Sequence, residues 1–242
     1  MLELRHVGFE TDDNKEILRD VSLTVQDRFV AITGPNGGGK TSLAKLIAGL
    51  AQPSSGRILL NGADITALDI TQRARLGIAF AFQQPVRFKG LTVRDLLELA
   101  AGGRLTDGEL CALLGKVGLC ANEYIHREMN ASLSGGEAKR IEIATVLARS
   151  AQLSIFDEPE AGIDLWSFAR LTETFEQIHR EQKDTMIIIS HQERIIRMAD
   201  EIVVVAGGEI ARRGTTEEVL PMILADTLGG CPVLGRKEEA QK

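Results

Sequence analysis

The sequence predicts an α/β fold built on a mainly parallel sheet. Short apolar segments, typical of buried strands, alternate along the 242 residues with segments whose apolar side chains recur at helical spacing. A glycine-rich turn connects one such strand to a helix, and residues 86–148 are rich in helical signals. Alternation of this kind is typical of helices packed on a parallel sheet. A chain of this length buries a full core as one large domain or as a core with a subdomain.

The first elements are strands followed by one helix. Apolar and polar residues alternate over 2–6 and again over 21–25, whereas 29–33 is a continuous apolar run, as expected of a strand buried on both faces. After the glycine-rich turn, apolar residues at i, i+3, i+4 and i+7 predict a helix over 40–50 that ends near Pro53.

The middle and the C-terminal third differ in character. Thr92 and Thr106 each precede an acidic residue by three positions, which is the spacing of a capping box at a helix start. Strands then return at 153–156, 186–190 and 202–205, and a glycine turn at 206–208 leads into a strand at 209–212.

Composition narrows the class of protein. The chain carries 28 Lys and Arg against 34 Asp and Glu, a net charge of −6, so it lacks the basic footprint of a nucleic-acid binder and we expect no nucleic acid as partner. The apolar runs are far shorter than the ~20 residues that span a bilayer. The N-terminal residues are charged and alternating, and the three cysteines form no close pair or metal-ligand spacing. We therefore expect a cytoplasmic protein.

A phosphate-binding loop is the strongest motif. The run Gly34-Pro-Asn-Gly-Gly-Gly39-Lys40-Thr41 fits the pattern G-x-x-x-x-G-K-[ST], with a predicted strand before it and a helix after it. Glycines allow successive backbone N–H groups to surround a phosphate, Lys40 brings a positive charge to the β- and γ-phosphates, and the Thr41 hydroxyl is a ligand for Mg²⁺. The predicted nucleotide-binding residues are Gly34, Pro35, Asn36, Gly37, Gly38, Gly39, Lys40, Thr41 and Ser42.

Two acidic residues follow the apolar strand at 153–156. Asp157 and Glu158 stand at the carboxyl end of a predicted parallel strand, where α/β sheets bind ligands. We expect Asp157 to hold Mg²⁺ and Glu158 to polarise the attacking water.

A second anion site is predicted at the start of the helix that runs to about residue 150. Ser134 is a plausible N-cap with Glu137 three positions on, and Gly135 and Gly136 lie between them. Backbone N–H groups and the helix dipole make such an N-terminus suited to an anion.

Together the segments GPNGGGKT, LSGGE, FDEPEAGID and IIISH, in this order, resemble the ATP-binding-cassette (ABC) ATPases over essentially the whole chain. The resemblance implies a P-loop NTPase core with a mainly parallel sheet, an antiparallel β subdomain and a helical subdomain. The expected division is 1–85 for the first part of the ATP-binding core, 86–148 for the helical subdomain with the signature motif, and 149–242 for the rest of the core with a C-terminal segment. ATP and Mg²⁺ are the implied cofactors.

The resemblance also implies roles for single residues. Gln83 corresponds to the glutamine that contacts Mg²⁺ and senses the partner protein, and His191 to the histidine that contacts the γ-phosphate and the water. Lys40, Gln83, Glu158 and His191 are thus the expected catalytic residues. Asp164 corresponds to the aspartate that communicates across the dimer. Phe9, in preference to His6, is the candidate for stacking on adenine, with a core aromatic as the alternative.

In this family ATP lies between two cassettes, and Ser134 and Gly136 of one copy complete the site of the other. We therefore expect an ATP-dependent homodimer, or pairing with a related cassette. The runs Glu160-Ala-Gly-Ile-Asp164 and Glu137-Ala-Lys-Arg140 are similar to the Suf-system ATPase of iron–sulfur cluster assembly, whose partner is a SufB/SufD-like scaffold.

The alternative is the nucleotide-binding subunit of a membrane transporter, peripheral to the membrane beneath a permease. The short stretch between Gln83 and Ser134 is closer to that class. In either case we expect Phe88, which stands between two charged residues, to be exposed and to contact the partner. The other interpretation is that Phe88 lies in a solvated loop that contacts no partner.

Overall fold

The computed structural model describes residues 1–130, 132–181 and 184–229; Cys231, whose role the sequence left open, lies outside them. The strands are β1 (Leu2–Glu10), β2 (Glu16–Val25), β3 (Phe29–Thr33), β4 (Ser55–Leu60), β5 (Ala63–Asp64), β6 (Ile78–Ala81), β7 (Leu153–Asp157), β8 (Thr185–Ile189), β9 (Glu201–Ala206) and β10 (Glu209–Thr215). The helices are α1 (Lys40–Ala48), α2 (Ile70–Arg75), α3 (Val93–Ala101), α4 (Asp107–Lys116), α5 (Ala121–Tyr124), α6 (Gly135–Ala148), α7 (Leu165–Glu181), α8 (Glu193–Ile196) and α9 (Thr216–Gly229).

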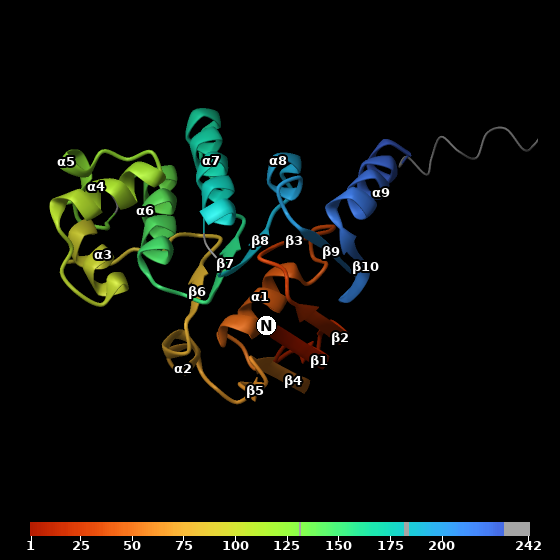
Figure 1. The fold of residues 1–242 in the computed structure, drawn as a ribbon. Coiled ribbons are helices and arrows are strands. Elements are labelled where there is room, and N and C mark those ends of the chain that lie inside the picture. The colour runs from red at the N-terminus through yellow and green to blue at the C-terminus, as the bar shows by residue number, and fades with distance from the viewer. Residues whose placement is uncertain (131, 182–183, 230–242) are drawn as a thin grey trace, which may run out of the picture.

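Two sheets organise the protein (Figure 1). The larger has the order β10-β9-β3-β8-β7-β6, and its strands from β9 to β6 pair in parallel, whereas β10 is an antiparallel edge strand. The smaller is antiparallel, with the order β2-β1-β4-β5. The predicted α/β class with a mainly parallel sheet and an antiparallel β part is confirmed.

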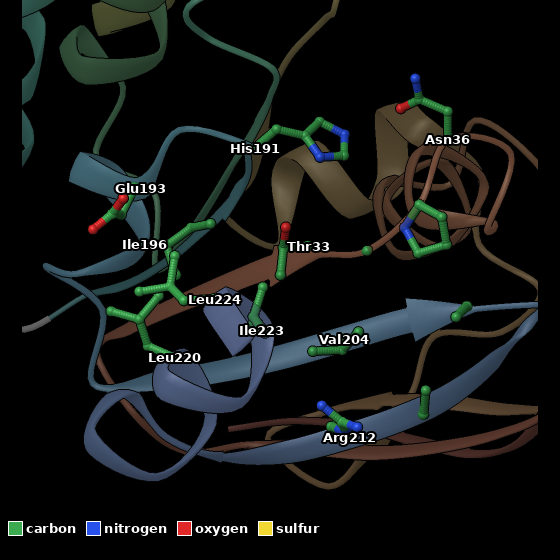
Figure 2. A pocket seen from close by; sticks show the side chains of 14 residues that line it. Thr33, Asn36, His191, Glu193, Ile196, Val204, Arg212, Leu220, Ile223 and Leu224 are labelled. Carbon is green, nitrogen blue, oxygen red and sulfur yellow. The ribbon is translucent and has the colours of Figure 1, made fainter. Parts of the chain in front are cut away.

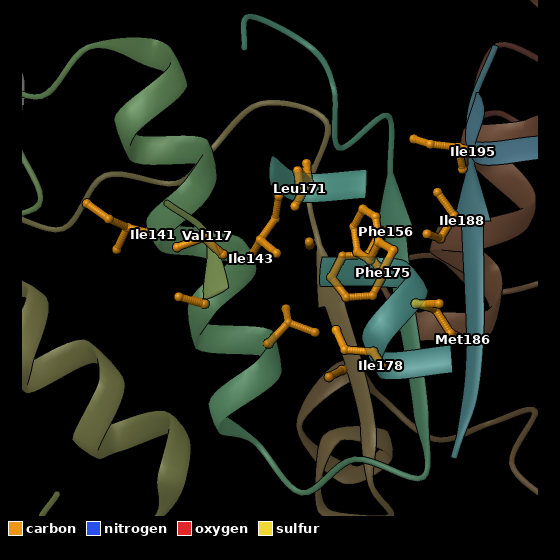
Figure 3. Close-up of a cluster of buried hydrophobic side chains, with 14 of the residues drawn as sticks. Val117, Ile141, Ile143, Phe156, Leu171, Phe175, Ile178, Met186, Ile188 and Ile195 are labelled. Atoms are coloured by element: carbon orange, nitrogen blue, oxygen red, sulfur yellow. The ribbon is translucent and has the colours of Figure 1, made fainter. Parts of the chain in front are cut away.

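The central strands β3, β7 and β8 of the large sheet are buried along most of their length, as their continuous apolar runs require, whereas the edge strand β10 is largely exposed. Along β3, Phe29 and Ala31 belong to one hydrophobic cluster, whereas Val30 and Ile32 belong to another. The first cluster lies against α6 and α7, where Phe156 and Phe175 meet edge to face with ring centroids 5.0 Å apart (Figure 3). The second joins the large sheet, α1 and the small sheet.

Local signals explain several element boundaries. Thr92 and Thr106 form the predicted capping boxes at the starts of α3 and α4, each with its side chain accepting from the backbone three residues on. Gly207 and Gly208 have φ of 59° and 83°, the left-handed conformations that a tight hairpin between β9 and β10 requires. The helices α3 to α6 gather at one end of the molecule, away from β9, β10 and α9 (Figure 1).

Arg73 holds α2 against the C-terminal end of α1. Its guanidinium is fully buried and donates to the carbonyl oxygens of Ile47 (3.1 Å), Leu68 (3.0 Å), Thr66 (2.9 Å) and Leu46. A buried cation is thereby paired with carbonyl dipoles at a helix C-terminus, which its charge stabilises.

Among the described residues, no helix combines the length and the apolar character that crossing a bilayer requires.

Candidate functional site

The predicted phosphate loop lies between the end of β3 and the start of α1. It borders a hollow of about 560 Å³ whose lining is Lys15, Ile17, Asn36, Gly37, Gly38, Gly39, Lys40, Thr41, Ser42, Gln83, Glu158 and His191. Gly34 has φ of +131°, and a Cβ there would lie 2.1 Å from the Val205 carbonyl oxygen. Only glycine therefore fits where the loop leaves the sheet.

Lys40 is almost completely buried and its ammonium group is already partnered. Its Nζ donates to the carbonyl oxygens of Gly34 (2.8 Å) and Pro35 (2.9 Å), so it curls back over the loop. Burial lowers the pKa of Lys40, while the neighbouring carboxylates oppose that change. The lysine is held in place and can exchange two carbonyl acceptors for phosphate oxygens.

Asp157 and Thr41 form a contact between β7 and α1. The Thr41 hydroxyl donates to Asp157 Oδ1 at 3.2 Å, and burial raises the pKa of the carboxyl. A buried carboxylate beside a hydroxyl is a pair of hard oxygen donors, which is what Mg²⁺ prefers. No cluster of three or more metal-ligating side chains occurs in the described residues. Mg²⁺ usually takes one or two protein carboxylates and fills its shell with phosphate and water, so this donor set fits it.

Three further side chains converge above the phosphate loop. Gln83 Nε2 donates to Glu158 Oε2 at 2.6 Å, and His191 Nε2 lies 4.0 Å from Glu158 Oε1. They come from the end of β6, the end of β7 and the end of β8, three neighbouring parallel strands. The carboxyl edge of the sheet therefore brings together an amide, a carboxylate and an imidazole next to Lys40, the arrangement needed to orient a water beside a phosphate.

The segment predicted to be a second anion site forms the capped start of α6. Ser134 caps α6, its Oγ accepting from the Glu137 N–H (3.2 Å), while Glu137 Oε2 accepts from the Ser134 N–H (2.7 Å). A hydrogen bond from the Tyr124 hydroxyl, followed by those from Ser134 and the charge of Arg127, lowers the pKa of Glu137 to about 2. Ser134, Gly135 and Gly136 do not line the hollow at Lys40.

The loop that contains Asp164 is attached to this second site. Asp164 Oδ1 accepts from the backbone N–H groups of Trp166 (3.1 Å) and Ser167 (3.0 Å) and thereby caps α7. Gly162 packs so closely on Gly136 that a Cβ on the latter would lie 2.9 Å from the Gly162 carbonyl oxygen. The two predicted anion sites thus lie apart within one chain, as expected if each completes the site of another copy.

Phe9, which was predicted to stack on adenine, lies outside the lining of the nucleotide hollow. Its ring is partly buried against the hydrophobic cluster between the two sheets and does not line the hollow. His6 is exposed, with Nδ1 2.6 Å from Asp20 Oδ1. Lys15 and Ile17 occupy that wall instead. The core alternative for Phe9 therefore agrees with the structure.

A buried lysine–glutamate pair that the sequence did not reveal links α6 to the backbone beside Gln83 and Asp157. Lys139 is completely buried, and its Nζ donates to the carbonyl oxygens of Gln83 (3.3 Å), Asp157 (3.2 Å) and Phe82. Glu142 Oε1 accepts from the Phe82 N–H at 3.2 Å, and Oε2 lies 3.7 Å from Lys139 Nζ. The pair clamps the backbone just before Gln83 from both sides.

A second buried carboxyl joins the loops that carry Glu158 and His191. Ser190 Oγ donates to Glu160 Oε1 at 2.6 Å and accepts from the Gln192 N–H at 2.9 Å. Burial raises the pKa of Glu160, whose Oε2 is buried with no hydrogen-bond partner in the described part of the chain. Movement of one loop is therefore transmitted to the other.

Comparison with known proteins agrees with this geometry. A family model described as ABC transporter matches residues 18–161. An uncharacterized ABC transporter ATP-binding protein of Methanocaldococcus jannaschii is 36% identical over 215 residues, covering 85% of this chain and 86% of the relative. The sulfate/thiosulfate import ATP-binding protein CysA of a Synechocystis species is 36% identical over 212 residues, covering 84% of this chain and 57% of that protein.

The fold has a matching solved structure. A dimeric ATP-binding cassette in a post-hydrolysis state with ADP and Pi superposes with a TM-score of 0.80 at 23% identity, covering 89% of this chain and 99% of that one. At that identity the match supports the fold alone. On the matches in sequence, the chain belongs to the ABC transporter ATPase family, whose members bind ATP with Mg²⁺ and hydrolyse it.

Proposed function

We propose that this chain is the nucleotide-binding subunit of a membrane transporter, in which ATP draws two cassettes together and hydrolysis releases them. The main support for ATP hydrolysis in this proposal is that Gln83, Glu158 and His191 converge above the phosphate loop. Gln83 donates a hydrogen bond of 2.6 Å to Glu158. The transporter names of the relatives favour this role over the Suf-type ATPase that the sequence led us to expect.

In this proposal each side chain has a distinct task. Lys40 exchanges its carbonyl acceptors for the β- and γ-phosphates, and Glu158 orients the attacking water and accepts its proton. His191 contacts the γ-phosphate, and Ser134 and Gly136 of a second copy close the site with the N-terminus of α6. Mg²⁺, held through Thr41, Asp157 and Gln83, supplies positive charge that offsets the charge of the phosphates.

We further propose that residues 86–148 move as a helical subdomain against a core formed by 1–85 and 149–242. Gln83 stands at the joint, and its backbone is held by Lys139 of α6. Rotation of the helical part would therefore pull on the residue that contacts Glu158. Binding of a partner to that part and hydrolysis at Glu158 are coupled through one glutamine.

An apolar groove gives the partner a place to bind. A hollow of about 200 Å³ separates α1, α2 and β6 from α3 and α6, and its lining includes Ile70, Phe80, Phe82 and Ala100. Phe80 and Phe82, which line the groove, directly precede Gln83 in the sequence. An apolar groove of this kind could bind an amphipathic helix of a permease. Phe88 is 42% exposed in the loop that follows, as its expected contact with a partner requires.

The enzymatic part is tested with two variants and one control. Lys40→Ala is expected to lose nucleotide binding, whereas Glu158→Gln is expected to bind ATP and lower kcat by about 10² to 10⁴, the usual contribution of a general base. Glu173→Gln, an acid on the exposed face of α7, is the matched control and should hydrolyse ATP like the wild type. Wild-type turnover by both site variants would refute the assignment.

The partner is tested by purification of the tagged protein from its native cells after gentle solubilisation of the membranes. We expect an integral permease to co-purify, and Ile70→Asp and Phe88→Asp to reduce its recovery. Met222→Asp places the same change at an exposed apolar residue of α9 and serves as control. Full recovery with both Ile70→Asp in the groove and Phe88→Asp in the adjoining loop would contradict this docking surface.

The Suf-type ATPase remains the second candidate because two residues that carry that resemblance, Lys139 and Glu160, make hydrogen bonds beside the site. Lys139 is fully buried and donates to the Asp157 carbonyl oxygen, and the half-buried Glu160 accepts from the Ser190 hydroxyl beside His191. Recovery of soluble scaffold proteins in place of a permease, in the same purification, would reverse the order of the two candidates.

A further inference from the structure

An apolar cavity lies beside the nucleotide hollow and has no role in the ATPase described so far (Figure 2). Its volume is about 740 Å³, and β9 and β10 form its floor, with α8 and α9 at one side. Ile196, Leu220, Ile223 and Leu224 gather at that side (Figure 2). Asn36 of the phosphate loop stands at the opposite rim.

The cavity shares part of its rim with the nucleotide hollow. Asn36 and His191 line both spaces. A protein segment that reaches the γ-phosphate side of the hollow from outside would therefore pass over the mouth of the cavity. In the proposed head-to-tail dimer, the cavity would therefore adjoin the surface that the second cassette covers.

Two large apolar side chains at the start of α7 are exposed to solvent. Leu165 and Trp166, the first residues of α7, are 77% and 84% exposed. Trp166 borders a shallow groove with Arg140 and Arg170, but that groove leaves the indole almost fully in water. Adjacent exposed side chains of this size typically mark a contact surface.

These two residues are fixed to the signature segment. They directly follow Asp164, which caps α7, and Gly162 is packed on Gly136. If Ser134 and Gly136 reach the nucleotide of a second copy, Leu165 and Trp166 arrive with them at the rim where Asn36 and His191 stand.

We propose that Trp166, together with Leu165, inserts into this apolar cavity of a second copy of the chain when ATP closes the dimer. The inference rests on the head-to-tail dimer of the proposed function and adds the residues that hold it together. A two-fold arrangement inserts each indole into the other copy, so both contacts form at once. An aromatic side chain buries about 150–250 Å² on leaving water, which makes Trp a frequent dominant residue of interfaces.

The chain offers a direct probe because Trp166 is its only tryptophan. In the Glu158→Gln variant with ATP and Mg²⁺, light scattering should report a dimer. The indole emission should shift to shorter wavelength at the same protein concentration, and quenching by acrylamide should fall severalfold. With ADP in place of ATP, the emission should stay at the wavelength of an exposed indole.

Variants in the Glu158→Gln background test the two sides of the contact separately: the indole of one copy and the cavity of the other. Trp166→Asp, which adds an acid favourable to a helix N-terminus, should raise the dimer dissociation constant about a hundredfold, as expected for a central aromatic residue. Ala211→Phe, which fills the cavity from the exposed edge strand β10, should do the same by at least about tenfold. Met222→Asp, outside the cavity lining, is the control and should leave it unchanged.

The outcomes distinguish this inference from the proposed function. A dimer that forms with ATP while the indole stays exposed, or one that tolerates Trp166→Asp and Ala211→Phe, overturns the insertion and leaves the ATPase intact. A chain that binds ATP but stays monomeric at high concentration overturns it too. Failure to bind a fluorescent ATP analogue overturns the proposed function itself.

Discussion

The buried carboxyl of Glu142 makes the stability of this protein depend on pH in an unusual direction. Glu142 is 8% exposed, and burial raises its pKa to about 7, although Lys139 and the Phe82 N–H oppose that change. In the folded protein the group therefore keeps its proton over a range in which the unfolded chain has lost it. Because the folded state then binds more protons, its stability falls as pH rises.

The size of the effect follows from the two pKa values. With 4.5 for the unfolded chain and about 7 for the folded one, stability from this group is fully present below 4.5 and is lost as pH rises through about 7. The loss amounts to about 3 kcal/mol. Glu142→Gln resembles the neutral acid and cannot ionise, so the free energy of unfolding of the variant, relative to wild type, should increase by about 2.5 kcal/mol between pH 5 and pH 8.

Urea unfolding followed by circular dichroism at constant ionic strength measures this difference. Glu173→Gln, on the exposed face of α7, is the control and should differ from wild type by the same small amount at every pH. A difference between Glu142→Gln and wild type that stays constant from pH 5 to pH 8 would refute the reasoning.

Three further predictions concern other parts of the molecule. Arg73→Met should lower the free energy of unfolding by about 3 kcal/mol, seen as a lower urea midpoint, because buried carbonyls lose a charged donor. Tyr124→Phe should raise the pKa of Glu137 above about 2; that carboxylate stabilises the fold above pH 4.5 and stops doing so as pH falls through about 2, so the acid-unfolding midpoint should move to higher pH. Gly34→Ala should weaken binding of a fluorescent ATP analogue at least about tenfold, because its Cβ meets the Val205 carbonyl.

Local signals predicted those parts of the fold that depend on neighbouring residues. The strand at 29–33, the glycine turn at 206–208 and the helix after the phosphate loop all follow from apolar spacing or from glycine, and the structure has them. The convergence of Glu158 and His191 follows from the rule that parallel strands end at one edge of the sheet. These features need only sequence-adjacent information.

Three other features were not predicted, each for a different reason. The long helix α7 buries Leu171, Phe175 and Ile178 at helical spacing, a signal that the sequence does carry directly after the acidic motif. Helix α9 contains Pro221, which sequence rules place at helix ends. Shifts of register in the pairing of β1 with β2 break the simple alternation, so the face on which Phe9 lies was not predictable from period.

The buried polar links were beyond sequence reasoning for another reason. A lysine and a glutamate three positions apart on a helix normally indicate a solvated face. Lys139 is buried because the backbone of Phe82 and Asp157, distant in sequence, supplies carbonyl acceptors for it. Such a pairing depends on how the strands and α6 come together, which a single sequence does not state.

The left-handed backbone conformation of Glu158 affects how this enzyme can evolve. Its φ of 44° lies in the left-handed region, which costs a non-glycine residue of order 1 kcal/mol or more, and its N–H is held by the Ile189 carbonyl at 3.0 Å. Asparagine and aspartate adopt that conformation with less strain, so drift toward them would relax the fold and, on the role proposed for Glu158, impair hydrolysis. A duplicated copy of this gene freed from selection for turnover would thus be expected to become a more stable, catalytically silent cassette.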